Sequence, residues 1–229
     1  MILARHPALP NLAASVALSL AAIAPQAGAA PLNTAFGGNP YADTALSGTT
    51  LAARPELAGT VLTDLDQAFT VGAVSGVVQS RVVRETASGT LDFYWRVIID
   101  PSSPGGVTAL RLADFGYGSL TDADYRIDGP GTDTVATARL FNPAMRPAGD
   151  INFLFAAPLA GDESSSFFFL HTNATDYAQS AIYDVVDASD NLSTVFDTFA
   201  PAVPEPAPAA LLGLGLLTLL WRRRGVPRG

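Results

Sequence analysis

The stretch GTLDFYWRVIID, from Gly89 to Asp100, decides the fold class of this chain. Its large apolar side chains occupy every second position: Leu91, Phe93, Trp95, Val97 and Ile99. Successive side chains of a β-strand point to opposite faces, so these five share one face and are expected to fill a core. Asp92, Tyr94 and Arg96 are expected to face the other way. The stretch therefore predicts a half-buried strand, with Trp95 in the core.

Similar short runs with a period of two follow along the chain and are separated by turn-forming residues. They predict strands at residues 68–74, 77–86, 107–112, 134–141, 150–155, 166–172, 181–187 and 194–199. Residues 64–69 and 174–181 could each form one helical turn. Residues 31–59 have weak periodicity and are expected to be a first strand with long loops, or a partly disordered lead. About nine short strands predict an all-β fold, a single β-sandwich or jelly-roll-like domain over residues 30–199.

Composition excludes several classes of function. The chain has 229 residues, a formal net charge of -8 and no cysteine. All of its basic residues are arginines, and several of them lie at the two ends, so the middle of the chain is more acidic than the total suggests. A nucleic-acid partner is not expected, because binding phosphate backbones requires a basic surface. The absence of cysteine rules out disulfides, thiolate metal sites and cysteine nucleophiles.

The first 29 residues have the layout of a secretory signal peptide. Arg5 provides the positive charge, residues 12–24 the apolar stretch, and Pro25 ends it. Ala27 and Ala29 are small residues at the -3 and -1 positions, which predicts cleavage after Ala29. We therefore expect export. The alternative is a buried N-terminal helix in a cytosolic protein.

The C-terminal residues have the layout of a short membrane segment. Residues 200–208 form a proline-rich stalk, and an uncharged run that ends at Trp221 predicts a single hydrophobic helix at about residues 207–221. A helix from Pro206 to Trp221 would be about 24 Å long, which is short for a hydrocarbon core of roughly 30 Å. Arg222, Arg223 and Arg224 follow at once and are expected to stay cytoplasmic. The body would then lie outside the membrane.

This tail resembles the PEP-CTERM sorting signal of Gram-negative bacteria. The resemblance covers residues 203–225 and rests on Val203, the Pro204-Glu205-Pro206 element, the apolar helix and the arginine cluster. It implies that Pro204, Glu205 and Pro206 are recognised by exosortase, a membrane-embedded cysteine-type transpeptidase. It also implies that the helix anchors the chain only transiently in the inner membrane, with Arg222–Arg224 as the cytoplasmic stop. The alternative is an ordinary single-span anchor.

The body contains candidate catalytic side chains but no catalytic motif. His171 is the only histidine outside the leader, and no G-x-S-x-G motif accompanies it. It is expected to end a strand whose apolar neighbours fill the core. A glycosidase would need two carboxylates, and the glutamates available are Glu56, Glu85 and Glu163. No local pattern selects a pair, so no catalytic residue, metal site or cofactor is predicted.

Two further groups of residues could bind a ligand. Four aspartates lie close together in sequence, which would suit Ca²⁺ in an oxygen-rich loop: Asp122, Asp124, Asp128 and Asp133. Their spacing does not match an EF-hand, and aspartate also favours turns. Tyr94, Tyr117 and Tyr125 could be exposed and stack on sugar rings.

The sequence as a whole predicts a non-enzymatic protein of the cell surface or extracellular matrix. The resemblance implies sorting by exosortase and an association with exopolysaccharide and biofilm. Two alternatives remain open: a carbohydrate-binding module for the same polysaccharide, and a hydrolase acting on it.

Overall fold

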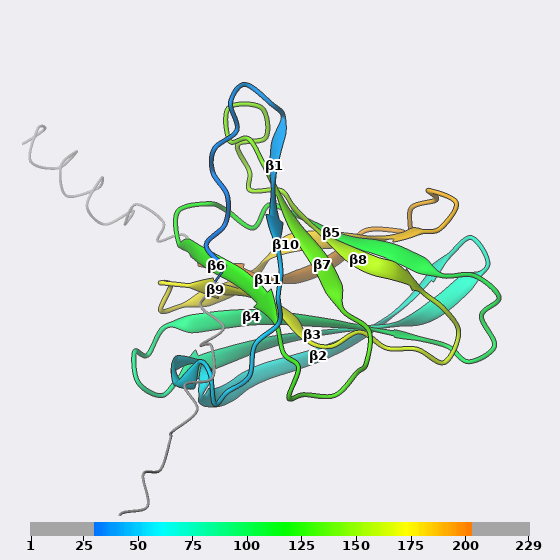
Figure 1. Ribbon diagram of the computed structural model, residues 1–229, viewed down its shortest axis with the longest axis horizontal. Coiled ribbons are helices and arrows are strands. Elements are labelled where there is room, and N and C mark those ends of the chain that lie inside the picture. Colours follow the sequence, from blue (N-terminus) through cyan, green and yellow to red (C-terminus); the bar gives the residue numbers. More distant parts are fainter. Residues whose placement is uncertain (1–29, 203–229) are drawn as a thin grey trace, which may run out of the picture.

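The alternating stretch forms strand β4 (Leu91–Ile99), the middle strand of one of two antiparallel sheets (Figure 1). This computed structural model describes residues 30–202. The five-stranded sheet has the order β2 (Gly59–Val71), β3 (Val74–Glu85), β4, β9 (Phe168–Thr172) and β6 (Leu120–Tyr125). The six-stranded sheet has the order β1 (Tyr41–Ala45), β7 (Val135–Phe141), β8 (Ile151–Leu159), β5 (Val107–Ala113), β10 (Tyr177–Asp187) and β11 (Phe196–Pro201). The predicted all-β sandwich is confirmed.

The core lies between the two sheets and is built on the predicted face of β4. Leu91, Phe93, Trp95, Val97 and Ile99 are all buried in the main apolar cluster. The Trp95 ring packs against aromatic rings from both sheets, among them Phe153 of β8 and Phe168 of β9. Its indole N–H donates to Thr198 Oγ1 of β11 at 3.0 Å. The single tryptophan of the sandwich therefore joins the two layers both by packing and by a buried hydrogen bond.

The outer face of the six-stranded sheet is polar. The strand register places Asp43, Arg139, Asn152, Arg111 and Asp184 in one row across five strands. Arg139 binds Asp43 with a shortest distance of 2.7 Å, and Arg111 binds Asp184 through two nitrogens. This face is solvated, as expected for one side of an antiparallel sheet.

The outer face of the five-stranded sheet is partly covered. A segment at residues 46–58, between β1 and β2, crosses it and contains the 3₁₀-helix η1 (Pro55–Leu57). Leu57 packs there in a second, smaller apolar cluster with Val83, Tyr94, Phe167 and Phe169. This cover explains why Tyr94 and Asp92, on the outer side of β4, are buried.

Several predicted elements differ from the structure. The predicted strand at 68–74 is broken by a tight turn at Gly72, whose φ of 54° favours glycine. The helical turns predicted at 64–69 and 174–181 are wrong: the first lies within β2, and β10 begins at Tyr177. Pairing with β3 stabilises β2 as a strand, because its alternate side chains can then turn inward.

The structure also extends the prediction at both ends of the domain. Residues 31–59 contain β1 and η1, and β6 is a strand that the periodicity of the sequence did not predict. The last strand ends at Pro201, two residues beyond the predicted domain end at 199. Within residues 30–202 no helix is long and apolar enough to cross a membrane. The signal peptide, most of the stalk and the helix predicted at 207–221 lie outside the described residues.

Candidate functional site

A row of polar side chains crosses the covered face of the five-stranded sheet. His171 of β9 is the register partner of Asp92 on β4 and of Asp122 on β6. Register partners in antiparallel sheets place their side chains on the same face, so the imidazole lies between two aspartates. β9 is far from both of its neighbours in sequence, and Asp92 and His171 are separated by 79 positions. The sheet order therefore creates this row.

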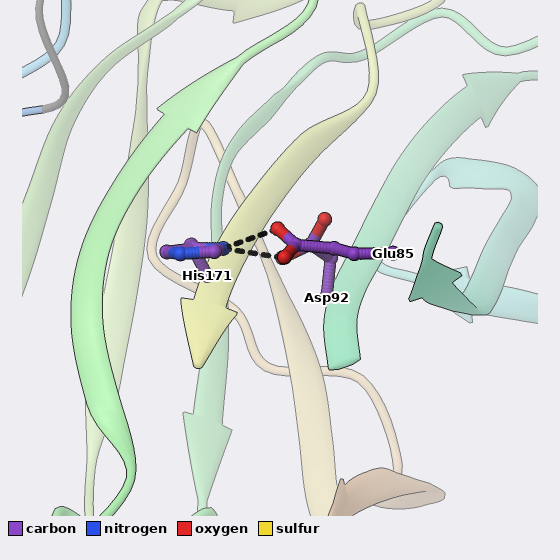
Figure 2. A group of neighbouring side chains, drawn as sticks. All are labelled: Glu85, Asp92 and His171. Carbon is purple, nitrogen blue, oxygen red and sulfur yellow. Dashed lines mark hydrogen bonds and ion pairs between the residues drawn. The ribbon is translucent and has the colours of Figure 1, made fainter. Parts of the chain in front are cut away.

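Glu85 joins the row from the hairpin between β3 and β4. The turn is closed by Glu85 N–H bonding Thr90 C=O and by Gly89 N–H bonding Glu85 C=O. Gly89 has a φ of 75°, which glycine adopts without strain. The hydroxyls of Ser88 and Thr90 both donate to Glu85 Oε2. The hairpin thus holds one carboxylate oxygen and directs the other, Oε1, toward His171 (Figure 2).

Glu85, Asp92 and His171 together form what we call the carboxylate–histidine cluster. His171 Nδ1 lies 2.7 Å from Asp92 Oδ1 and 3.1 Å from Glu85 Oε1. The side chains of Glu85 and Asp92 are 2% and 0% exposed, and that of His171 is 18% exposed. His171 Nδ1 is close enough to Glu85 Oε1 for an ion pair, yet Glu85 Oε1 accepts no hydrogen bond within residues 30–202. The reason is that Nδ1 carries at most one hydrogen, and it points to Asp92.

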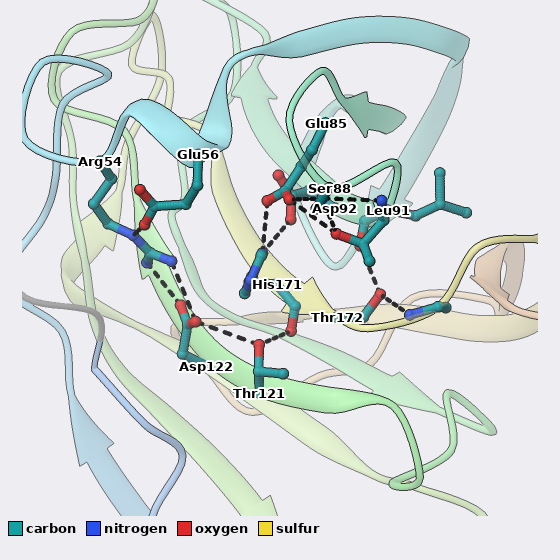
Figure 3. Close-up of polar contacts among 12 residues, drawn as sticks. Arg54, Glu56, Glu85, Ser88, Leu91, Asp92, Thr121, Asp122, His171 and Thr172 are labelled. Carbon is teal, nitrogen blue, oxygen red and sulfur yellow. Dashed lines mark hydrogen bonds and ion pairs between the residues drawn. The ribbon is translucent and has the colours of Figure 1, made fainter.

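Arg54 forms a second group beside the cluster (Figure 3). Its Nη1 and Nη2 atoms donate to the two carboxylate oxygens of Asp122 at 2.7 and 3.2 Å, and its Nε donates to Glu56 at 2.8 Å. The side chains of Arg54 and Asp122 are only 4% and 7% exposed. The covering segment thus brings a cation onto a face rich in carboxylates.

Burial and neighbouring charges shift the pKa values of these groups. Burial raises the pKa of Asp92 above its ordinary value, although the hydrogen bond from His171 opposes this. Burial alone would lower the pKa of His171, but the hydrogen bond to Asp92 and the surrounding carboxylates raise it overall. Arg54 holds the pKa of Glu56 below its ordinary value despite the opposing effect of burial. The cluster therefore favours a positive charge at its centre.

An open hollow lies next to the cluster on the same face. It has a volume of about 270 Å³ and is lined mainly by apolar groups, with the arginines Arg81 and Arg126. Arg81 pairs with Asp64, and Arg126 pairs with Asp128. On the other sheet a hollow of about 260 Å³ is lined by Asp150 and Asp184 among others. Each of these aspartates is paired with an arginine, Arg146 and Arg111 respectively.

The structure brings together some of the side chains singled out in the sequence and separates others. His171 ends a strand beside buried phenylalanines, as predicted, but it also meets Glu85, which the sequence did not link to it. Glu56 lies nearby through Arg54, whereas Glu163 lies in the β8–β9 loop and accepts from Ala160 N–H. The alternation of Asp122 and Asp124 with Ala123 was the signal that could have revealed β6 and hence part of this row.

The predicted aspartate loop and the predicted stacking surface are not formed. Asp122 and Asp124 are buried on β6, and Asp124 accepts from the backbone N–H groups of Gly48 and Tyr125. Asp128 binds Arg126, and Asp133 accepts from the Thr132 hydroxyl, so the four aspartates have separate partners. Tyr94 and Tyr125 are only 4% and 9% exposed, because residues 46–58 cover this face. The prediction that they could stack on sugars is therefore wrong, and Tyr117 is half-buried with its hydroxyl bonded to Arg146 C=O.

Comparison with known proteins identifies the C-terminal residues. The family model of the PEP-CTERM protein-sorting motif matches residues 202–224, directly after the end of β11. The match includes the Pro204-Glu205-Pro206 element and Arg222–Arg224. Of the matched residues, Ala202 alone belongs to the part of the chain that the structure describes. No curated protein and no solved structure matches the chain. The chain thus carries the sorting motif of an exported exosortase substrate, attached to a β-sandwich.

Proposed function

We propose that this chain is a non-enzymatic β-sandwich that exosortase delivers to the cell surface or extracellular matrix, where it associates with exopolysaccharide. The observation that carries the proposal is the sorting motif at residues 202–224. Ala202, its first residue, donates its backbone N–H to Asp176 C=O, and β11 ends one residue earlier. The sorting signal therefore begins where the hydrogen-bonded sandwich ends, so cutting the chain near Pro206 would leave every described strand intact.

The arrangement of carboxylates supports a non-enzymatic role. Glycosidases place two carboxyl groups roughly 5–9.5 Å apart on either side of the scissile bond. In the carboxylate–histidine cluster, both carboxylates are buried and both face one imidazole from its Nδ1 side. A sugar bond does not fit between them. The aspartates at the second hollow, Asp150 and Asp184, each bind an arginine, so neither carboxylate is free to contact a substrate.

Replacing Pro204, Glu205 and Pro206 together with alanine tests the sorting step. In the native cells the variant should stay as a full-length precursor in the inner membrane, while a Pro208→Ala control is processed normally. Surface protein is measured by protease shaving of intact cells and by immunoblotting of fractions. Arrival of the triple variant at the surface in its processed form would contradict exosortase sorting.

A carbohydrate-binding module is the second candidate, and the hollow beside the cluster favours it. Its two arginines could accept an acidic sugar if their partners Asp64 and Asp128 gave way. Glycan-array binding by the purified chain, lost on Arg81→Met and Arg126→Met, would support this function. Hydrolysis of the polysaccharide that is lost on Asp184→Asn would instead favour a hydrolase.

A further inference from the structure

Glu85 Oε1 is a buried carboxylate oxygen that points toward His171 but accepts no hydrogen bond from it. Ser88 and Thr90 hold the other oxygen, so the carboxylate has little freedom to turn away. The single proton of His171 Nδ1 belongs to Asp92, which is 0.4 Å closer than Glu85 (2.7 against 3.1 Å). A buried polar atom without a partner costs roughly 1–3 kcal/mol, and more when it is charged. This oxygen needs a positively charged neighbour.

The wider surroundings contain more negative than positive charge. Four carboxylates face this part of the sheet, from Glu56, Glu85, Asp92 and Asp122. Arg54 is committed to two of them, Asp122 and Glu56. Glu85 and Asp92 are left with His171 alone, and an imidazolium carries one charge against their two. A divalent cation in place of the Nδ1 proton would balance both carboxylates.

We propose that Glu85, Asp92 and His171 bind a divalent transition-metal ion, of which Zn²⁺ fits the ligand set best. The ligand atoms would be Glu85 Oε1, an Asp92 carboxylate oxygen and His171 Nδ1, which all lie within 4.8 Å of one another. The ion would take the place of the Nδ1 proton, which is released to solvent on binding. Protein atoms bind Zn²⁺ at about 2.0–2.2 Å. Two ligands of one such ion are therefore roughly 3.3–3.6 Å apart in tetrahedral geometry and roughly 2.8–3.1 Å apart when adjacent in octahedral geometry. The observed separations of 2.7 and 3.1 Å from Nδ1 are close to the octahedral spacing and would open by a few tenths of an ångström or more in a tetrahedral site.

The chemistry of the donors selects the metal. Ca²⁺ and Mg²⁺ prefer oxygen ligands alone, whereas an imidazole nitrogen favours Zn²⁺ and its neighbours in the first transition series. Three protein ligands leave one tetrahedral position for water. An ion bound here would satisfy Glu85 Oε1 and join the β3–β4 hairpin to β9. Its expected role is to clamp the covered face of the sheet.

Metal binding by the full chain in detergent tests the proposal. The chain is stripped with a chelator, dialysed against Zn²⁺ and assayed by elemental analysis; Co²⁺ in place of Zn²⁺ should give visible d–d absorption. We expect one Zn²⁺ per chain and a rise in the unfolding temperature when Zn²⁺ is added. Glu85→Gln and His171→Gln should each weaken Zn²⁺ binding by at least about tenfold.

Two controls separate binding at the cluster from adventitious binding and from misfolding. Glu163→Gln removes a glutamate outside the cluster, and this variant should keep the full Zn²⁺ affinity. Glu85→Gln retains an oxygen for the Ser88 and Thr90 hydroxyls, so its metal-free form should be no less stable than the wild type. Its unfolding temperature should not respond to Zn²⁺. Zn²⁺ affinity that is unchanged in Glu85→Gln, or no bound Zn²⁺ in the wild type, would overturn the proposal.

Discussion

Replacing Arg54 with methionine should destabilise the sandwich by about 3–5 kcal/mol. Arg54 donates two hydrogen bonds to Asp122, and both side chains are more than nine-tenths buried. Methionine fills similar space but leaves the Asp122 carboxylate buried without a cation. The Thr121 hydroxyl lies 3.3 Å from Asp122 Oδ2 and 2.8 Å from His171 C=O, but it is neutral and cannot replace the charge of the guanidinium. The large expected loss comes from the stranded charge, since the intact buried pair itself contributes little net stability.

A matched control exists on the opposite sheet. Arg139 also binds an aspartate through two nitrogens. Both guanidinium groups lie over an aromatic ring, that of Phe169 for Arg54 and that of Tyr41 for Arg139. Its partner Asp43 has a side chain that is 43% exposed. Arg139→Met should therefore cost no more than about 1 kcal/mol, because water can solvate the freed carboxylate. The two variants make the same substitution and differ mainly in burial, since the second carboxylate that Arg54 binds, Glu56, is 44% exposed and can be solvated by water.

The free energies of unfolding can be measured by urea titration of the full chain in mild detergent with EDTA present. Trp221→Phe as the common background leaves Trp95 as the only tryptophan, so fluorescence reports on the core. Adding Asp122→Asn to Arg54→Met should recover about 2–3 kcal/mol, which measures the coupling between the two residues. Equal losses in Arg54→Met and Arg139→Met would refute the reasoning that burial makes this ion pair critical.

Two further predictions concern a buried hydrogen bond and the response to acid. Thr198→Val should cost about 1–3 kcal/mol because the Trp95 N–H loses its acceptor, whereas Thr198→Ser should stay close to wild type in the same urea titration. The hydrogen bond from Arg126 lowers the pKa of Asp128, so the stability that Asp128 contributes is complete above its unfolded pKa of about 3.9. It is lost as the pH falls through the lower folded value. Asp128→Asn should therefore lower the free energy of unfolding at pH 7 by at most about 1 kcal/mol, which is seen as a lower unfolding temperature. This loss should vanish near pH 2. An equal loss at both pH values would contradict the assignment.

Local periodicity was sufficient to predict the strands that bury one apolar face. β4 is the clearest case, because its five apolar side chains alternate without interruption and all enter the core. β6 was missed because aspartates at alternate positions resemble turn residues. Asp122 and Asp124 are instead buried through partners on the distant segment 46–58, Arg54 and the Gly48 N–H group. Such compensation depends on tertiary contacts that a single stretch does not reveal.

The candidate site could be predicted only in part for a related reason. The strand that carries His171 was predicted, but its meeting with Asp92 depends on β9 pairing with β4 across 79 positions. Glu85 reaches the same point because the hairpin after β3 turns it toward β9. The predicted exposure of Tyr94 was wrong, because residues 46–58 cover it in the folded chain. The sequence of that segment has no periodicity that predicts where it packs. The sorting motif, in contrast, is a linear signal and was recognisable without a fold.

The most direct test of the central claim is the intact mass of the mature protein isolated from its native cells. Sorting by exosortase predicts a chain that begins at Ala30 and has lost the C-terminal helix and Arg222–Arg224, with its new C-terminus near Pro206. Any attached lipid or glycan would add mass at that end. A mature protein that retains Arg222–Arg224 would contradict the account.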